Sequence, residues 1–95
     1  MDCKEIKFSG HAVRRMFERG ISIDDVLAVI VSGEVISEYP EDAPFPSCLI
    51  LGFVSTRPIH VVTARDPRSG TCYVITTYPP HPAQWSTDFK TRRSP

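Results

Sequence analysis

Two segments near the beginning of the chain place their hydrophobic side chains at the spacing of an α-helix. The first is predicted to follow an N-cap at Ser9 and to run to about Arg19, because Gly20 is a typical residue just past a helix end. Its apolar side chains share one arc of the helix: Ala12, Val13, Met16 and Phe17. The pattern therefore predicts a short amphipathic helix that buries this arc.

The second helix is predicted to start after Ser22 and to stop at Gly33. Asp25 stands three residues after Ser22, which is the spacing of a capping box. The apolar residues on its predicted buried face are Ile23, Val26, Leu27, Ile30 and Val31. Because only Gly20 and Ile21 separate the two helices, they should form an αα-hairpin.

The hydrophobic period then changes to that of strands. Four strands are predicted, over residues 34–39, 47–54, 58–64 and 71–78, and residues 4–8 offer a short additional strand before the helices. The proline-rich residues 40–46 read as a loop, and residues 66–70 read as a tight turn. Short connections favour antiparallel pairing of consecutive strands.

The chain after the last strand is predicted to form a short helix over residues 83–90, with Trp85 and Phe89 packed on the sheet. The expected fold is therefore α+β. Two N-terminal helices cover one face of a four-stranded antiparallel sheet, in the order (β)ααββββ with a short C-terminal helix. A length of 95 residues predicts a single domain over residues 1–95.

Composition predicts the cellular compartment and argues against disordered, membrane-spanning and secreted proteins. Hydrophobic residues make up 41% and charged residues 23%, as in ordinary globular proteins. No apolar run approaches the roughly 20 residues that cross a bilayer. The charged start lacks the apolar stretch of a signal peptide, so we expect a cytoplasmic protein without a membrane partner.

The three cysteines are widely spaced and form no Cys-x-x-Cys pair, which argues against a zinc finger or a redox motif. Cys48 and Cys72 lie in apolar runs, so we expect both to be buried thiols, with Cys3 at a frayed end.

Charge is unevenly distributed although the formal net charge is zero. Residues 1–20 carry five basic and three acidic side chains, residues 21–46 carry six acidic and no basic ones, and residues 47–95 carry six basic and two acidic ones. A bipolar surface would steer a polyanion to one side of the molecule. If folding intermixes the segments, the charges are ordinary solvated ones.

The polar arc of the first helix is the strongest candidate for chemistry. Its members are His11, Arg14, Arg15 and Glu18, with Arg19 beside them. Guanidinium groups bind phosphate and stabilise a phosphoryl transition state, and an imidazole transfers protons near neutral pH. The structural alternative is a solvated helix face with ion pairs such as Arg14–Glu18.

Later residues supply further candidates. His60 lies in a predicted strand: it is a core histidine if the helices cover its face, and part of a binding surface if that face is open. Tyr78 at a strand end could stack on a base or transfer a proton, or could simply be a rim residue. Arg92 and Arg93, with Lys90, form a basic tail that could contact phosphates or serve solubility alone.

Familiar cofactor and metal motifs are absent from the sequence. There is no Gly-rich phosphate loop, no G-x-S-x-G and no H-E-x-x-H, and the three histidines are scattered. We therefore expect neither a nucleotide cofactor nor a metal.

Several longer motifs stand out once the elements are assigned: HAxxRMxERGIS over 11–22, GEVIxxYP over 33–40, PSCLILG over 46–52, PIHVV over 58–62, WxxDF over 85–89 and RR at 92–93. With these motifs the chain resembles a bacterial family of small proteins known only as a domain of unknown function. The resemblance covers nearly the whole chain.

That family is similar in size and element order to RelE/ParE-like toxins, including the BrnT and MqsR types. The resemblance implies a toxin encoded beside an antitoxin-like partner. RelE-like toxins cleave mRNA without a metal through basic and aromatic residues on a concave sheet face, whereas ParE-like members bind gyrase. The neutral net charge departs from these basic toxins.

The leading hypothesis is a metal-independent endoribonuclease. In it Arg14, Arg15 and Arg92 hold phosphate, His11 or His60 moves the proton, and Tyr78 stacks or donates. The rival is a non-catalytic protein-binding or regulatory module, and a weaker third hypothesis is a small-molecule enzyme that uses its thiols. The oligomeric state stays open, a homodimer included.

Overall fold

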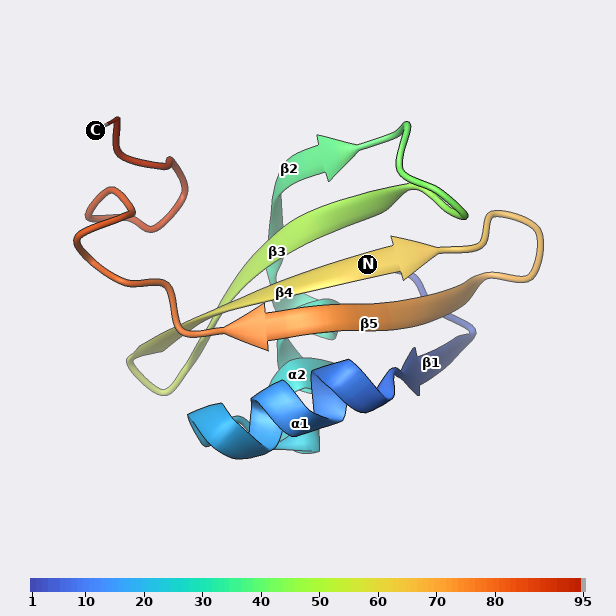
Figure 1. The fold of residues 1–95 in the computed structure, drawn as a ribbon, viewed down its shortest axis with the longest axis horizontal. Coiled ribbons are helices and arrows are strands. Elements are labelled where there is room, and N and C mark those ends of the chain that lie inside the picture. The colour runs from blue at the N-terminus through green and yellow to red at the C-terminus, as the bar shows by residue number, and fades with distance from the viewer. Residues whose placement is uncertain (95) are drawn as a thin grey trace.

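The computed structural model describes residues 1–94, which form one mixed five-stranded sheet and two helices (Figure 1). In chain order the elements are β1 (Glu5–Phe8), α1 (Gly10–Arg19), α2 (Ile23–Ser32), β2 (Glu34–Tyr39), β3 (Ser47–Val54), β4 (Arg57–Arg65) and β5 (Thr71–Tyr78). The strand order across the sheet is β1-β5-β4-β3-β2. The predicted α+β class, both helices, the four main strands and the optional first strand are confirmed.

Both helices lie on one face of the sheet. α1 packs against β5 and is drawn below it in Figure 1, and α2 packs against β3 and β4 and is drawn behind the strands. The core fills the space between the helices and this face, with Ala12, Met16, Ile21, Val26, Val29, Ile30, Cys48, Ile50, Ile59, Val61 and Val74 as its buried members. Because side chains alternate along a strand, the residues between these strand positions point to the opposite face.

Capping residues fix the helix ends where the sequence predicts them. The Ser9 hydroxyl accepts from the amide of Ala12 at 3.0 Å, and Gly20 adopts the left-handed conformation with φ +63°. Ser22 and Asp25 form a reciprocal capping box with both hydrogen bonds at 3.0 Å. The two helices are therefore bounded by local interactions.

The buried helix faces are narrower than the hydrophobic arcs predict. Phe17 keeps 89% and Val31 74% of its accessible surface exposed, and Val13 and Ile23 are also exposed. Each helix rests on the sheet through one stripe, so apolar side chains beside that stripe stay partly or largely exposed. Val29, which the predicted face omits, lies within the stripe of α2 and is buried.

The prediction of a purely antiparallel four-stranded sheet is wrong at one edge. β1 joins as a fifth strand and runs parallel to β5, with Glu5 opposite Thr71 and Phe8 opposite Val74. The other neighbouring strands are antiparallel. This pairing joins segments more than sixty residues apart, and no local sequence pattern indicates it.

The expectation of three unpaired thiols is also wrong. Cys3 and Cys72 form a disulfide that links the residues before β1 to β5, with their Cα atoms 5.6 Å apart. Cys3 is therefore tied to the sheet rather than frayed. Cys48 is a free, buried cysteine, as predicted.

The predicted helix over residues 83–90 does not form. Residues 79–94, here called the C-terminal segment, fold as turns closed by an isolated bridge between Trp85 and Arg92. Phe89 has a φ of +61°, which a right-handed helix does not allow. Neither helix in the described part of the chain has the length and hydrophobicity that a membrane crossing requires.

Candidate functional site

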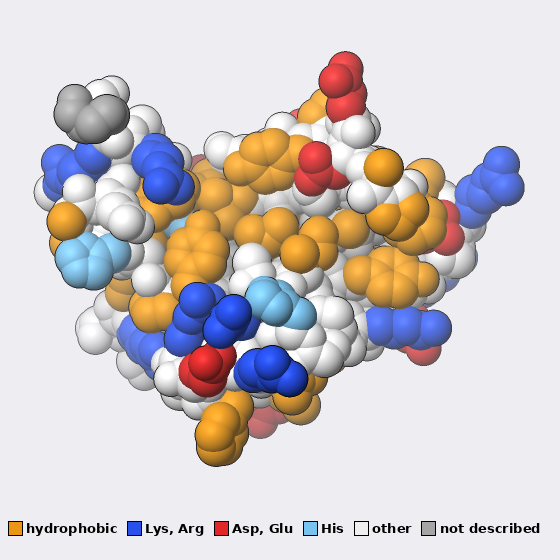
Figure 2. Space-filling model, in the orientation of Figure 1, with side chains coloured by type: hydrophobic (Ala, Val, Ile, Leu, Met, Phe, Trp, Pro, Cys, Tyr) orange, Lys and Arg blue, Asp and Glu red, His pale blue; other side chains and the backbone are white. Residues whose placement is uncertain are grey.

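A groove of about 320 Å³ lies on the sheet face turned away from the helices, between β2 and the C-terminal segment. We call it the tyrosine groove; its lining residues are Ser37, Tyr39, Leu49, Val62, Tyr78, Trp85, Lys90, Thr91 and Arg92. Figure 2 views this face, with hydrophobic side chains across its middle and Lys and Arg side chains over the C-terminal segment and α1. The groove therefore combines an aromatic floor with a basic rim.

His60 is fully buried beneath the C-terminal segment. Its Nε2 lies 2.8 Å from the carbonyl oxygen of Phe89, its Nδ1 lies 3.3 Å from the hydroxyl of Tyr78, and its ring meets the edge of Trp85 at 4.4 Å between centroids. The sequence leaves open whether His60 is buried under the helices or exposed on an open sheet face. Neither holds, because the imidazole is buried on the other face, under the C-terminal segment. It lies directly behind the groove and contacts it through Tyr78.

The hydrogen bonds of His60 define its tautomer. A carbonyl oxygen only accepts, so the hydrogen of a neutral imidazole must be on Nε2, where it is donated to Phe89. Nδ1 is then an acceptor, and the hydroxyl of Tyr78 donates to it. This places the Tyr78 proton on the buried side and turns the remaining lone-pair density of the oxygen away from the imidazole.

Burial keeps both members of this pair neutral. It lowers the pKa of His60 below the ordinary 6.5, although the hydrogen bond to Phe89 offsets part of the effect. Burial also raises the pKa of Tyr78 above the ordinary 10.0, and nearby Tyr39 raises it further, whereas Arg92 and Arg19 lower it. A neutral hydroxyl therefore donates to a neutral imidazole at physiological pH.

Two guanidinium groups approach Tyr78 from different elements. Arg92 lies over the ring of Trp85, with its guanidinium carbon 5.9 Å from the ring centroid. Arg19 donates to the carbonyl of Thr77 at 2.8 Å. Arg57 on β4 helps to place Arg19, because it donates to the carbonyls that end α1. Both cations lie near enough to Tyr78 to lower its pKa, but only Arg92 lines the groove.

The other predicted site residues lie away from this groove. His11 and Arg14 are exposed on α1, and Arg15 pairs with Glu18 at 2.7 Å, so the ion pair on this face involves Arg15 rather than Arg14. His11 and Arg19 are separated by roughly 12 Å along the helix axis. Arg93 donates to the carbonyl of Pro82 at 3.0 Å and is not part of the groove lining.

The structure thus gathers His60, Tyr78 and Arg92 at the groove, with Arg19 outside its lining but near enough to lower the pKa of Tyr78. His11, Arg14, Arg15 and Arg93 lie on the surrounding surface. Sequence reasoning missed Tyr39, whose only signal is its place at the end of a strand. It also assigned Trp85 only a packing role. Lys90 lines the groove and forms an ion pair with Glu34 at 3.0 Å, which ties the C-terminal segment to β2.

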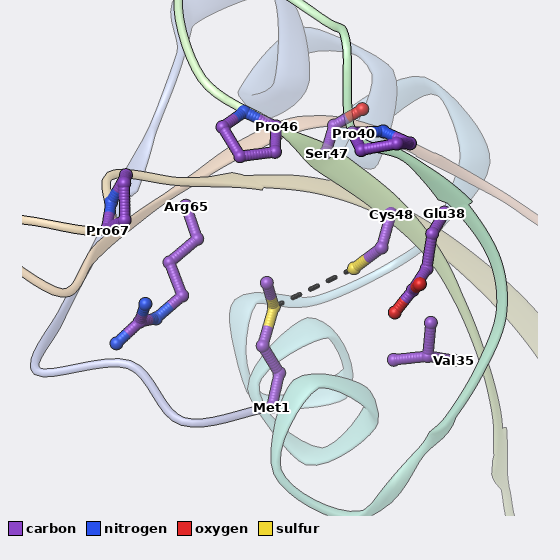
Figure 3. Close-up of a pocket in the computed structure, with 9 residues that line it drawn as sticks. All are labelled: Met1, Val35, Glu38, Pro40, Pro46, Ser47, Cys48, Arg65 and Pro67. Atoms are coloured by element: carbon purple, nitrogen blue, oxygen red, sulfur yellow. Dashed lines mark hydrogen bonds between the residues drawn. The ribbon is translucent and has the colours of Figure 1, made fainter.

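A larger cavity of about 390 Å³ lies elsewhere and contains none of the predicted site residues (Figure 3). Met1, Cys48 and Arg65 are among its lining residues, and the Cys48 Sγ lies 3.9 Å from the Met1 Sδ. Burial raises the pKa of the Cys48 thiol, and Glu38 raises it further. A thiol of raised pKa is a poor nucleophile, so this cavity does not favour the thiol-enzyme hypothesis.

Acidification should destabilise the protein through His60. Its folded-state pKa is below 6.5, so the unfolded state binds more protons as the pH falls below this value. The contribution of His60 is complete above pH 6.5 and is lost as the pH approaches the lowered folded-state pKa. Urea unfolding between pH 5 and 8 should show this loss of free energy of unfolding.

The control for this prediction is a matched pair of variants. His60→Gln should flatten the pH dependence in this window, whereas His11→Gln, at an exposed position, should retain it. An unchanged pH slope in His60→Gln would show that the imidazole titrates equally in both states.

The fold and the groove define a class: a small α+β protein whose helices cover one sheet face and whose other face carries tyrosines, arginines and a buried histidine. The chain belongs to the family described as "Domain of unknown function (DUF4258)", whose model matches residues 8–79. Comparison with the curated proteins and with the solved structures found no match. The matched range includes His60 and Tyr78 and ends at the start of the C-terminal segment that supplies Trp85 and Arg92.

Proposed function

We propose that this protein is a metal-independent endoribonuclease that acts on mRNA as the toxin of a toxin–antitoxin pair. The observation that supports this proposal is the hydroxyl of Tyr78, which is hydrogen-bonded to a buried neutral imidazole and has the charges of Arg92 and Arg19 near enough to lower its pKa. The RelE/ParE-like resemblance in the sequence points to the same chemistry. The proposal therefore assigns the tyrosine groove as the cleavage site.

In the proposed reaction the ribose 2′-oxygen attacks the adjacent phosphorus. Tyr78 accepts the 2′-hydroxyl proton while its own proton passes to Nδ1 of His60. The 2′-oxygen–phosphorus bond forms, the bond from phosphorus to the 5′-oxygen breaks, and the leaving oxygen takes a proton from water. The products are a 2′,3′-cyclic phosphate and a 5′-hydroxyl, and His60 returns its proton to solvent through Tyr78.

The arginines have distinct roles in this scheme. Arg92, which lines the groove, stabilises the negative charge that builds up on the phosphoryl oxygens, and the charge of Arg19 adds to this from outside the lining. Arg14 and Arg15 on α1, with His11 and Arg93, bind RNA phosphates outside the groove. These basic side chains lie on α1 and the C-terminal segment, so positive charge is concentrated on one side of this face although the net charge is zero.

Induced expression of the chain alone in bacteria tests this function. We expect growth arrest with fragmented mRNA, and recovery when the neighbouring antitoxin-like gene is co-expressed. Normal growth with intact mRNA at a high yield of folded protein would refute the toxin function.

The charge of Arg92 gives a quantitative test of RNA binding. Arg92→Gln should weaken binding of a single-stranded 2′-O-methyl oligonucleotide, which cannot be cleaved by 2′-oxygen attack, and lower the slope of log affinity against log salt by about 0.7. Arg68→Gln, in the exposed turn before β5, removes the same charge and should change neither quantity. Equal effects of the two variants would show that Arg92 contributes only bulk charge.

A non-catalytic protein-binding module is the second candidate. The exposed side chains of Phe17 and Val31 on the helices favour it, because large apolar side chains at the surface often mark interaction sites. This candidate predicts a stable complex with a protein partner and no change in RNA. A purified protein that binds its partner but leaves RNA intact would support it over the nuclease.

A further inference from the structure

A second hollow of about 340 Å³ lies on the same sheet face as the tyrosine groove. We call it the aromatic hollow; its lining residues are Asp42, Ala43, Pro44, Phe45, Ala64, Tyr73 and Ile75. The rings of Phe45 and Tyr73 stack within it, 5.6 Å apart between centroids and inclined by only 10°. The loop between β2 and β3 therefore places a flat aromatic pair against β5.

The two hollows are neighbours along β4. Val62 lines the tyrosine groove and Ala64 lines the aromatic hollow. They are two residues apart on one face of the strand, so their Cα atoms are separated by roughly 7 Å. Tyr73 lies opposite Ala64 in the register of β4 and β5. One ligand can therefore occupy both hollows.

The charges of the two hollows differ. The tyrosine groove carries Arg92 and Lys90, whereas the aromatic hollow carries the carboxylate of Asp42 and no basic side chain. One oxygen of Asp42 accepts from the hydroxyl of Ser47, which fixes the carboxylate at the hollow. A carboxylate repels phosphate but accepts from an amino group on a base edge.

From this arrangement we propose that the aromatic hollow binds a nucleobase with an exocyclic amino group. The base belongs to the same single-stranded RNA whose phosphate lies in the tyrosine groove, so the inference rests on the proposed function. The base stacks on the Phe45–Tyr73 pair, and its amino group donates to Asp42. This hollow would then determine which sequences the protein prefers.

Equilibrium binding of fluorescent 2′-O-methyl oligonucleotides tests the stacking. Phe45→Ala and Tyr73→Val should each weaken binding of oligocytidylate by roughly 5- to 150-fold, the loss that corresponds to one stacked base. Tyr73→Phe retains the ring and should bind as the wild type does. Phe17→Ala removes an exposed ring outside the hollow and should also have no effect.

The amino-group preference has its own matched probes, because cytosine and uracil differ at the exocyclic position that Asp42 would read. Wild-type protein should bind oligocytidylate several-fold more tightly than oligouridylate, and Asp42→Asn should remove most of this preference. Equal affinity of the wild type for the two oligomers would overturn the role of Asp42.

The outcomes separate this inference from the proposed function. Thermal unfolding shows whether Tyr73→Val still folds, and Phe45→Ala, in a loop, provides the same test without altering a strand. If the wild type cleaves RNA and the folded Phe45→Ala variant binds RNA as tightly as the wild type, the role of the hollow is refuted and the nuclease function still stands. Binding that depends on Phe45 without cleavage would support the hollow and refute the nuclease.

Discussion

Replacing Tyr78 with phenylalanine should lower the rate of RNA cleavage by a factor on the order of 10² to 10⁴ while leaving the affinity for RNA nearly unchanged. The substitution removes only the hydroxyl that donates to Nδ1 of His60 at 3.3 Å. Without it no group in the groove connects the ribose 2′-hydroxyl to the buried imidazole. Single-turnover cleavage of a labelled unstructured RNA measures the rate, and mass spectrometry of the product ends identifies the cyclic phosphate.

The matched control is Thr76→Val, which removes a hydroxyl from the same strand but lies outside both the tyrosine groove and the aromatic hollow. It should cleave at the wild-type rate. The pH profile adds a second control, because cleavage requires neutral His60: the acid limb should have its midpoint below pH 6.5, in the direction that burial shifts this pKa. Full activity of Tyr78→Phe would remove the hydroxyl from the mechanism.

Replacing Gly33 with alanine should reduce the free energy of unfolding by about 3 kcal/mol and lower Tm by roughly 10–20 °C. Gly33 ends α2 and leads directly into β2. A Cβ atom there would lie 2.7 Å from the Cγ2 of Ile50 and 2.8 Å from the carbonyl oxygen of Leu51, and would overlap the carbonyl of Val29. Backbone atoms cannot move aside as a flexible side chain can, so α2 must shift from β3.

Gly10→Ala is the control for this prediction, because a Cβ at Gly10 meets no atom within 4 Å. Gly10 is the first residue of α1, where alanine should stabilise the helix by about 0.5–1 kcal/mol. Differential scanning calorimetry of both variants measures the effect. A Gly33→Ala variant as stable as the wild type would show that α2 and β3 separate easily.

The parts of the fold that the sequence predicts are those encoded by local signals. Ser9, Gly20 and the Ser22–Asp25 capping box bound the helices through contacts within four residues. The strands and their turns are similarly encoded by short patterns. The parallel pairing of β1, the disulfide and the turns of the C-terminal segment depend on contacts between distant residues, so no local pattern reveals them.

The candidate site illustrates the same division. His60 and Tyr78 can be selected individually as proton-transfer residues, but their pairing depends on a β-bulge. If β4 and β5 paired regularly from Arg65 opposite Cys72, Thr77 would lie opposite His60. The register shift between Val62 and Thr63 places Tyr78 opposite His60 instead. Because a slip of one residue turns a side chain to the other sheet face, this bulge decides whether Tyr78 meets the core or the groove.

The pairing of β1 with β5 also has a consequence for synthesis. Residues 5–8 are synthesised before their strand partners, residues 71–74, which follow more than sixty residues later. Contacts of such long sequence separation form late and slow the folding of a domain. β5, which joins β1 to the rest of the sheet, also carries Tyr78. A chain that ends before β5 therefore has neither the complete sheet nor the groove. An activity that depends on Tyr78 would therefore arise only after translation has passed β5.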